Sequence, residues 1–223
     1  MKNNVIRLSH IITQDVPSYG NRDFVKFKKK SSIIDGDTAN TSIWYFSNNH
    51  VGTHIDSPYH FDENGKKTYD ITIEDFIFNK VVVIDVPLKE GILISTDFLF
   101  KNIPHDIELL LIRTGYEQFR QKDKYWNDNP GIAPEVADFL RRSFPKLRCI
   151  GFDFISLTSW NHRKEGRESH KQFLCPENGG KEILIIEDMT LIQIRNPIHK
   201  VIVAPLFCED GNGGAVTIFA EIG

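Results

Sequence analysis

The chain has 223 residues, of which 40% are hydrophobic and 26% are charged, and its formal net charge is −3. A chain of this length and composition can bury a full hydrophobic core as a single domain over residues 1–223, and it is neither disordered nor fibrous. The slightly acidic balance provides no electrostatic reason to bind nucleic acid or an anionic membrane.

The first ten residues, MKNNVIRLSH, lack the apolar core of a secretory signal, and no apolar run approaches the length of a membrane span. The three cysteines, Cys149, Cys175 and Cys208, lie far apart and form no CxxC pair. We therefore expect free thiols in a reducing environment rather than a disulfide framework. These observations predict a cytoplasmic protein with no membrane partner.

Short apolar runs rich in β-branched residues recur along the chain, each bounded by Gly, Pro, Asn or Asp. This pattern is typical of β-strands, and runs that are apolar at consecutive positions indicate strands buried on both faces. The predicted strands lie at 5–12, 41–46, 80–86, 107–114, 146–153, 182–188, 200–207 and 214–222. The basic run KFKKK at 26–30 is predicted to be a solvated loop.

Four segments between these runs carry helical signals. Residues 72–76 begin close to a capping box, and residues 95–102 begin with a Ser/Thr cap. Residues 133–144 place Pro134 in the first turn and space apolar residues at helical intervals, and residues 166–174 form the fourth candidate. Strands outnumber helices and no domain boundary is visible, so the sequence predicts a single domain of the α/β or α+β class.

The stretch HVGTHIDSPYHF, which begins at His50, gathers three histidines and an aspartate within twelve residues. His50, His54 and Asp56 stand at even-numbered positions, so an extended segment would direct all three to one side, whereas a helix would turn Asp56 away. Gly52 and the following proline also disfavour a helix, and Gly52 is expected to leave space between the two imidazoles. Two imidazoles and a carboxylate with open coordination positions are typical of catalytic zinc sites, and manganese or iron would also accept them.

His60 lies beyond the proline of this stretch and is expected to point into the same space. From the residues alone, it is either a further ligand or a general acid/base. A single histidine in a loop is most often only solvated. A metal site is indicated because His50, His54, Asp56 and His60 all stand at even-numbered positions, which an extended segment would direct to one side.

The same stretch resembles the HxGTHxDxPxHF signature of the metal-dependent cyclase-like hydrolases, a family that includes bacterial kynurenine formamidase and isatin hydrolase. The resemblance covers most of the chain, including LSHIITQDVPSYG, LLLIRTGY, IGFDFISL, SHKQFL followed by ILIIEDM, and APLFCEDGNGGAVTIFA. It implies a swivelling β/β/α-type fold with a mixed sheet or barrel-like core, assembled as homodimers or homotetramers.

The resemblance also implies a set of metal ligands drawn from three parts of the chain: His50, His54, Asp56, His170 and Glu187. Asp56 would bridge two metal positions, and His60 would be the general acid/base. The expected ion is Zn²⁺, with Mn²⁺ as the alternative, and one or two ions per chain. A two-metal site requires the carboxylates of Asp56 and Glu187 to lie within about 7 Å of each other, given ligand distances like those of zinc.

The resemblance implies an enzyme that hydrolyses the C–N amide bond of a small aryl formamide resembling N-formylkynurenine, by metal-activated water. Trp44, Tyr59 and Phe61 flank the motif and are candidates for stacking on an aryl substrate, although aromatic residues are more often part of a core. The motif does not separate this activity from a hydrolase or cyclase acting on an isatin-like lactam, a lactone or a sugar derivative. The long segment 171–186 favours that alternative, and a non-catalytic metal-binding protein of the same fold is another.

Overall fold

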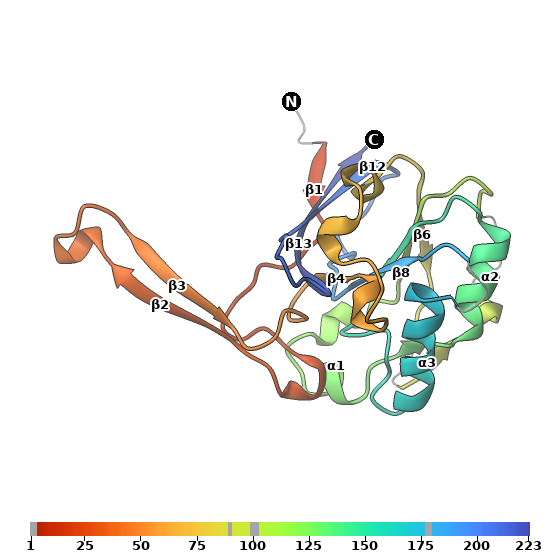
Figure 1. Cartoon of the computed structure of the whole chain (residues 1–223), viewed down its shortest axis with the longest axis horizontal. Helices are drawn as coiled ribbons and strands as arrows, with labels where there is room; N and C mark the ends of the chain where they lie inside the picture. The colour runs from red at the N-terminus through yellow and green to blue at the C-terminus, as the bar shows by residue number, and fades with distance from the viewer. Residues whose placement is uncertain (1–3, 89–90, 99–102, 177–179) are drawn as a thin grey trace.

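A mixed β-sheet of nine strands forms the centre of the computed structural model, which describes residues 4–88, 91–98, 103–176 and 180–223 (Figure 1). In the order in which they lie side by side, its strands are β5 (Ile77–Phe78), β12 (Ile198–Pro205), β13 (Gly213–Ile222), β4 (His54–Asp56), β11 (Leu184–Glu187), β10 (Cys149–Phe152), β8 (Leu109–Arg113) and β6 (Val81–Asp85). The ninth strand, β1 (Val5–Arg7), pairs with β13.

The sheet joins a parallel half to an antiparallel half. Strands β6, β8, β10 and β11 run parallel to one another, whereas β4, β13, β12 and β5 are paired antiparallel. The sheet curls until β6 contacts β12, which nearly closes it into a barrel. This is the mixed α/β architecture with a barrel-like core that the sequence predicts.

Successive residues of the parallel strands enter two different cores. On β8, Leu109 and Leu111 point into the barrel, while Leu110 and Ile112 pack on the outer layer that contains the helices. All four side chains are fully buried. This arrangement explains why the strand runs are apolar at consecutive positions, because each face of the strand meets a hydrophobic core.

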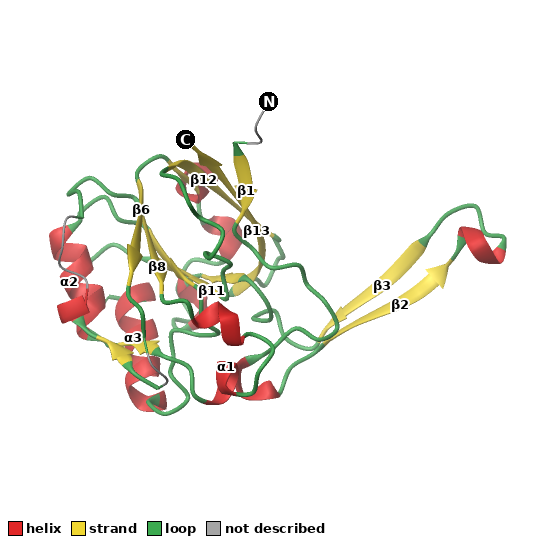
Figure 2. Ribbon diagram, turned by 180° about the vertical axis from the view of Figure 1, so that it is seen from behind, coloured by secondary structure: helices red, strands yellow, loops and turns green. Residues whose placement is uncertain are grey.

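The helices of the described residues are short apart from two. The α-helices are α1 (Lys124–Asn127), α2 (Glu135–Ser143) and α3 (Arg163–Leu174). The 3₁₀-helices are η1 (Tyr19–Asn21), η2 (Ile33–Asp35), η3 (Pro58–His60), η4 (Thr68–Asp70), η5 (Ile73–Phe76), η6 (Thr96–Phe98) and η7 (Tyr116–Phe119). Helices α2 and α3 pack against each other beside the parallel half of the sheet (Figure 2). In the ranges that the structure describes, none of the helices combines the length and the apolar character that a membrane span requires.

A long hairpin projects away from the rest of the chain (Figures 1 and 2). Its strands are β2 (Val25–Ser31) and β3 (Thr41–Phe46), paired antiparallel. The prediction that 26–30 forms a loop is therefore wrong, although most of its side chains are exposed as expected. Pairing with β3 satisfies the backbone N–H and C=O groups of this segment while its lysine side chains stay exposed. A run of charged residues therefore does not by itself indicate a loop.

Each of the eight predicted strands overlaps a strand of the structure, but the helices are less well predicted. Segments 72–76 and 95–102 contain only the 3₁₀-helices η5 and η6, and residues 99–102 lie outside the described part of the chain. Helix α2 falls inside its predicted range, and α3 begins three residues before 166. The short elements α1, β5, β7 (Leu93–Ile94) and β9 (Gly131–Ile132) carry too few residues to show a periodicity.

Candidate metal centre

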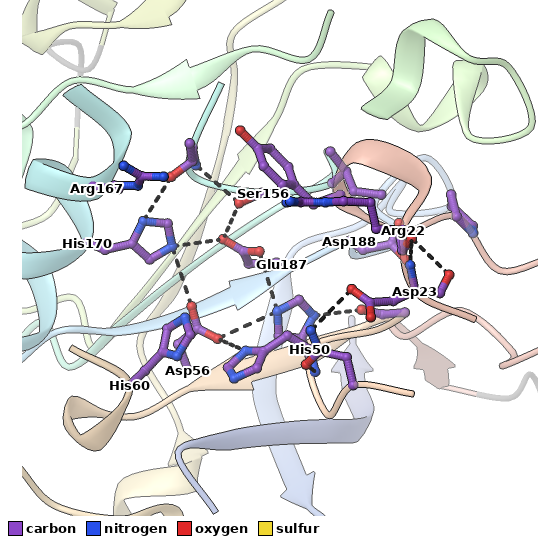
Figure 3. Close-up of a pocket in the computed structure, with 18 of the residues that line it drawn as sticks. Arg22, Asp23, His50, Asp56, His60, Ser156, Arg167, His170, Glu187 and Asp188 are labelled. Atoms are coloured by element: carbon purple, nitrogen blue, oxygen red, sulfur yellow. Dashed lines mark hydrogen bonds and ion pairs between the residues drawn. The ribbon is translucent and has the colours of Figure 1, made fainter. Parts of the chain in front are cut away.

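A cavity of about 330 Å³ opens beside β4, between the end of β11 and helix α3 (Figure 3). The residues predicted as metal ligands or as the acid/base all line it: His50, His54, Asp56, His60, His170 and Glu187. They come from a turn, two strands, a 3₁₀-helix and an α-helix, so the fold brings together groups up to 137 positions apart in the sequence, from His50 to Glu187.

The pairing of β4 with β11 places the first group of candidate ligands. His54 and Asp56 point to the same face because they alternate along β4, while Ile55 between them enters the barrel core. Glu187 is directly opposite His54 on the neighbouring strand, and directly paired side chains share a face. Nε2 of His54 lies 3.5 Å from Oδ1 of Asp56 and 3.4 Å from Oε2 of Glu187.

His50 reaches the cavity from the turn before β4. Its Nδ1 lies 2.8 Å from Oδ1 of Asp56, and its Nε2 lies 2.7 Å from Oδ1 of Asn212. The extended geometry predicted from position 50 onward holds only for β4 itself, because Gly52 adopts a φ of +73°. Gly52 therefore supplies a left-handed turn that L-residues rarely adopt.

Two imidazoles are oriented by backbone carbonyl groups. Nδ1 of His54 lies 2.8 Å from the carbonyl oxygen of Gly52, and Nδ1 of His170 lies 2.8 Å from that of Gly166. Each Nδ1–H donates to its carbonyl, which turns Nε2 toward the carboxylates. Histidines that bind metals are commonly held in this way, since the bond fixes both the ring and its tautomer.

His170 connects α3 to both carboxylates. Its Nε2 lies 3.6 Å from Oδ2 of Asp56 and 3.4 Å from Oε1 of Glu187. Oε1 of Glu187 also accepts hydrogen bonds from the backbone N–H of Leu157 at 2.7 Å and the hydroxyl of Ser156 at 3.2 Å. The carboxylate at the end of β11 is therefore held from three sides.

Two sets of three potential ligands converge to within 4.8 Å, namely His50, Asp56 and His60, and His54, Asp56 and Glu187. Asp56 belongs to both sets, as a bridging carboxylate would. Potential ligand oxygens of Asp56 and Glu187 lie within 4.8 Å of each other, which meets the distance requirement for a two-metal site.

The donor set fits a divalent cation. Asp56 and Glu187 are 1% and 4% exposed, and two neighbouring buried carboxylates are costly without positive charge beside them. Imidazole and carboxylate donors suit Zn²⁺ and Mn²⁺ alike. The chemistry of these residues therefore indicates a divalent metal ion such as Zn²⁺ or Mn²⁺.

In the protein without metal, protons on the histidines supply this positive charge. Burial opposes protonation, but hydrogen bonding to Glu187 and the charge of Asp56 raise the pKa of His54 to about 9. Burial likewise opposes protonation of His170, and the same two carboxylates raise the pKa of His170 to about 10. Burial favours the neutral carboxyl, yet hydrogen bonds from His170 and His54 lower the pKa of Glu187 to about 2.

We expect the thermal stability of the metal-free protein to fall as the pH rises. The pKa values of His54 and His170 are raised from 6.5 to about 9 and about 10, so their protonation stabilises the fold fully below pH 6.5. That contribution is lost as the pH passes through the raised values, where the carboxylates lose their counter-charge. Thermal unfolding of chelator-treated protein over this pH range measures the effect.

The His170→Gln variant is the control for this pH series, since its melting temperature should depend less on pH than that of the wild type. Added Zn²⁺ should reverse the trend, because metals bind deprotonated imidazoles. A melting temperature of the metal-free wild type that stays constant or rises over the range would contradict the charge assignment.

His60 lies on η3 with its ring stacked on that of His50, at a centroid distance of 4.1 Å. Burial lowers the pKa of His60 to about 4, and the neighbouring imidazoles of His50 and His170 contribute in the same direction. His60 is therefore neutral near pH 7. A neutral imidazole beside Asp56 can accept a proton, and it is also within range to act as a ligand.

Of the three aromatic residues predicted to contact substrate, only Phe61 lines the cavity, with its ring stacked on that of His170 at 4.9 Å. The ring of Tyr59 faces the amino group of Lys67 at 4.9 Å and does not line the cavity. Trp44 is 70% exposed on the projecting hairpin, away from the cavity of its own chain. Proximity in sequence is thus a poor guide, because Pro58 and β3 redirect the chain on either side of the motif.

Several residues that shape the site have no local sequence signal. Asn212 contacts His50 from the turn before β13, and a Cβ at Gly213 would lie 2.6 Å from Cε1 of His50. A Cβ at Gly166 would lie 2.6 Å from Cα of Thr158, so glycine allows α3 to approach this loop. These contacts become visible only when β13 and α3 are in place.

The family described as "Putative cyclase" matches residues 6–159, more than half of the chain. The chain belongs to this family. Kynurenine formamidase of Bacillus thuringiensis subsp. konkukian (strain 97-27) is 32% identical over 167 residues, which are 75% of this chain and 73% of the relative. The kynurenine formamidase of Bacillus anthracis is 30% identical over the same shares. These relatives identify the chain as an amidohydrolase and confirm the resemblance noted in its motif.

Solved structures share the fold of this family member at lower identity. Isatin hydrolase A from Labrenzia aggregata bound to benzyl benzoate superposes with a TM-score of 0.79 at 20% identity, covering 98% of this chain and 94% of that chain. A structure described as a potential metal-dependent hydrolase with cyclase activity gives 0.75 at 19% identity, with coverages of 97% and 96%. At these identities the comparison establishes the architecture.

Proposed function

We propose that this amidohydrolase cleaves the C–N bond of a small aryl formamide resembling N-formylkynurenine, with Zn²⁺, or alternatively Mn²⁺, at one or two positions. The observation that supports it most is the convergence of four other candidate ligands on Asp56, in a chain about 30% identical to kynurenine formamidases over three quarters of its length. The proposed ligands are His50, His54, Asp56, His170 and Glu187.

A divalent ion at such a site polarises a carbonyl oxygen and lowers the pKa of water toward ~7. In this proposal His60 accepts the proton of the attacking water and returns it to the departing nitrogen, a role that typically contributes ~10²–10⁴-fold. Phe61 forms part of the cavity wall beside His60 and His170, where an aryl ring of the substrate would lie.

Activity of the metal-reconstituted protein tests the proposal directly. We expect the highest kcat/KM for N-formylkynurenine and simple formanilides, and lower values for isatin and for lactones. The Asp56→Ala variant provides the background rate. Faster turnover of isatin or a lactone would favour the alternative hydrolase, and absence of turnover with full metal occupancy would favour a non-catalytic metal-binding protein.

We also propose that the protein is a homodimer held together through the β2–β3 hairpin, with a homotetramer as the alternative. Ile34 and Ile43 on this hairpin are 92% and 48% exposed, and isolated two-stranded hairpins are only marginally stable in water. Packing on a second copy would cover these side chains. A role for Trp44 in binding substrate requires that the hairpin of one copy reach the cavity of another.

Light scattering after gel filtration tests this assembly. We expect the wild type to elute as a dimer and the Ile34→Lys, Ile43→Lys variant to be monomeric, since charges cannot be buried unpaired in an interface. Ile73→Lys is the matched control, because Ile73 is 60% exposed on the main body of the chain. A monomeric wild type would rule out the dimer.

We place the protein in the cytoplasm, a proposal consistent with three unpaired thiols.

A further inference from the structure

Three arginines line the outer part of the cavity that holds the candidate metal ligands: Arg22, Arg163 and Arg167. All three are exposed. Within the described ranges none of them forms an ion pair with a carboxylate, whereas Arg113, Arg120, Arg141 and Arg148 each do. Asp23 also lines this cavity but forms no ion pair with these arginines within the described ranges, so in a chain whose net charge is −3 the three cations at one opening are a local feature of the site.

Two of these arginines share a face of α3 with His170. Positions 163, 167 and 170 follow the i, i+4, i+7 spacing, which aligns side chains along one side of a helix. At 1.5 Å per residue, Arg167 and Arg163 begin about 4.5 Å and about 10.5 Å from His170 along the helix axis. The helix therefore carries the candidate ligand His170, which is buried, and two exposed arginines that line the same cavity. Arg167 lies beside His170 in Figure 3.

The helix itself gains nothing from this arrangement. Like charges four residues apart repel, and Arg163 is the first residue of α3, where the helix dipole disfavours a cation. An anion bound between the arginines would remove both penalties.

Arg163 stacks on an aromatic ring that lies close to the backbone beside Arg22. The guanidinium carbon of Arg163 lies 3.6 Å from the ring centroid of Trp160, and Tyr19 meets the same ring edge-on at 5.3 Å. Gly20 lies against both Trp160 and Arg22, since a Cβ there would be 2.6 Å from Cζ3 of Trp160 and 3.2 Å from Nε of Arg22. Stacking leaves the edges of a guanidinium group free to donate hydrogen bonds.

We propose that Arg22, Arg163 and Arg167 bind a carboxylate of the substrate that is remote from the bond to be cleaved. The inference rests on the proposed function, and it defines the substrate class as aryl amides that carry an anionic side chain. Guanidinium groups match the geometry of a carboxylate and prefer it to neutral acceptors. With Asp56 and Glu187 at its base and the arginines at its mouth, the cavity orients such a substrate with its amide inward.

A pair of substrates that differ in one charge tests this assignment. The probes are 3-(2-formamidophenyl)propanoate and its primary amide, assayed with the metal-loaded protein. We expect kcat/KM to favour the anion by about 10-fold, chiefly through KM, which is the size expected for one charge-assisted hydrogen-bonding group. The Arg163→Gln, Arg167→Gln variant should lose this preference, because its kcat/KM for the anion should fall about 10-fold more than its kcat/KM for the neutral amide.

Lys164→Gln is the control for loss of positive charge from α3, because it removes one charge from the first turn of the helix at a residue that does not line the cavity. It should retain the preference for the anion. An unchanged preference in the double arginine variant, or a wild type that does not discriminate, overturns the inference.

A binding measurement separates failure of the inference from failure of the proposed function. If neither formamide is hydrolysed, the proposed function is wrong, and calorimetry of chelator-treated protein with 3-phenylpropanoate then tests the arginines alone. We expect the double arginine variant to bind this probe about 10-fold more weakly than the wild type and the Lys164→Gln variant. Equal affinities, or no binding by the wild type, would overturn the carboxylate site.

Discussion

Replacing His54 with alanine is expected to abolish stoichiometric metal binding and to reduce amide hydrolysis to the background rate. His54 is 3% exposed, and its Nε2 lies between the carboxylates of Asp56 and Glu187 while its Nδ1 is held by the carbonyl of Gly52. No other described side chain can replace a nitrogen fixed at that point. Loss of one ligand from a catalytic set should leave an ion weakly held, and chelation of the wild type should have the same effect on activity.

Elemental analysis together with reconstitution measures this effect. Activity lost on chelation should return with Zn²⁺ or Mn²⁺ in the wild type and should not return in His54→Ala. The control is His105→Ala, which changes an exposed histidine outside the cavity and should leave both metal content and turnover unchanged. Full metal occupancy in the His54→Ala variant would show that the motif is not the metal site.

The proposed metal ligands differ in how much of their position could be inferred from sequence. His54 and Asp56 alternate along a strand, and the period of a strand is local, so their shared direction follows from spacing alone. His50 also reaches the site, but through a turn at Gly52 rather than by continued extension. Its convergence with Asp56 was predicted from the wrong backbone geometry.

His170 and Glu187 could be placed only through resemblance to a family. Their convergence depends on the register between β4 and β11 and on α3 packing beside them, neither of which is encoded near either residue. The aromatic predictions show the same limit. Trp44 and Tyr59 are close to the motif in sequence, yet the hairpin and the turn at η3 direct them elsewhere. Local periodicity thus predicts strands and faces, whereas the contents of the cavity depend on long-range packing.

The second large effect is expected for His60→Ala, which should lower kcat by ~10²-fold or more while the protein keeps its metal and its thermal stability. The ring of His60 lies at the edge of the site, stacked on His50, and no hydrogen bond to its ring nitrogens occurs among the described residues. Its removal therefore leaves the five proposed ligands and their carbonyl partners in place.

Two companion variants separate proton transfer from packing. His60→Phe keeps an aromatic ring beside His50 but has no nitrogen to carry a proton, so it should lose as much kcat as His60→Ala. Tyr59→Phe is the neighbouring control, since Tyr59 lies outside the cavity, and it should turn over normally. Added imidazole should restore part of the activity of His60→Ala, because it can enter the space left by the ring and accept the same proton.

Metal content decides between the two roles open to His60. Its position within 4.8 Å of potential ligand atoms of His50 and Asp56 would also allow it to coordinate an ion. In that case His60→Ala would contain less metal than the wild type, and imidazole would restore metal content together with activity. Near-normal turnover of His60→Ala at full metal occupancy would remove His60 from the mechanism altogether. The proton acceptor would then be another group of the cavity, and the carboxylates of Asp56 and Glu187 lie beside the same imidazoles.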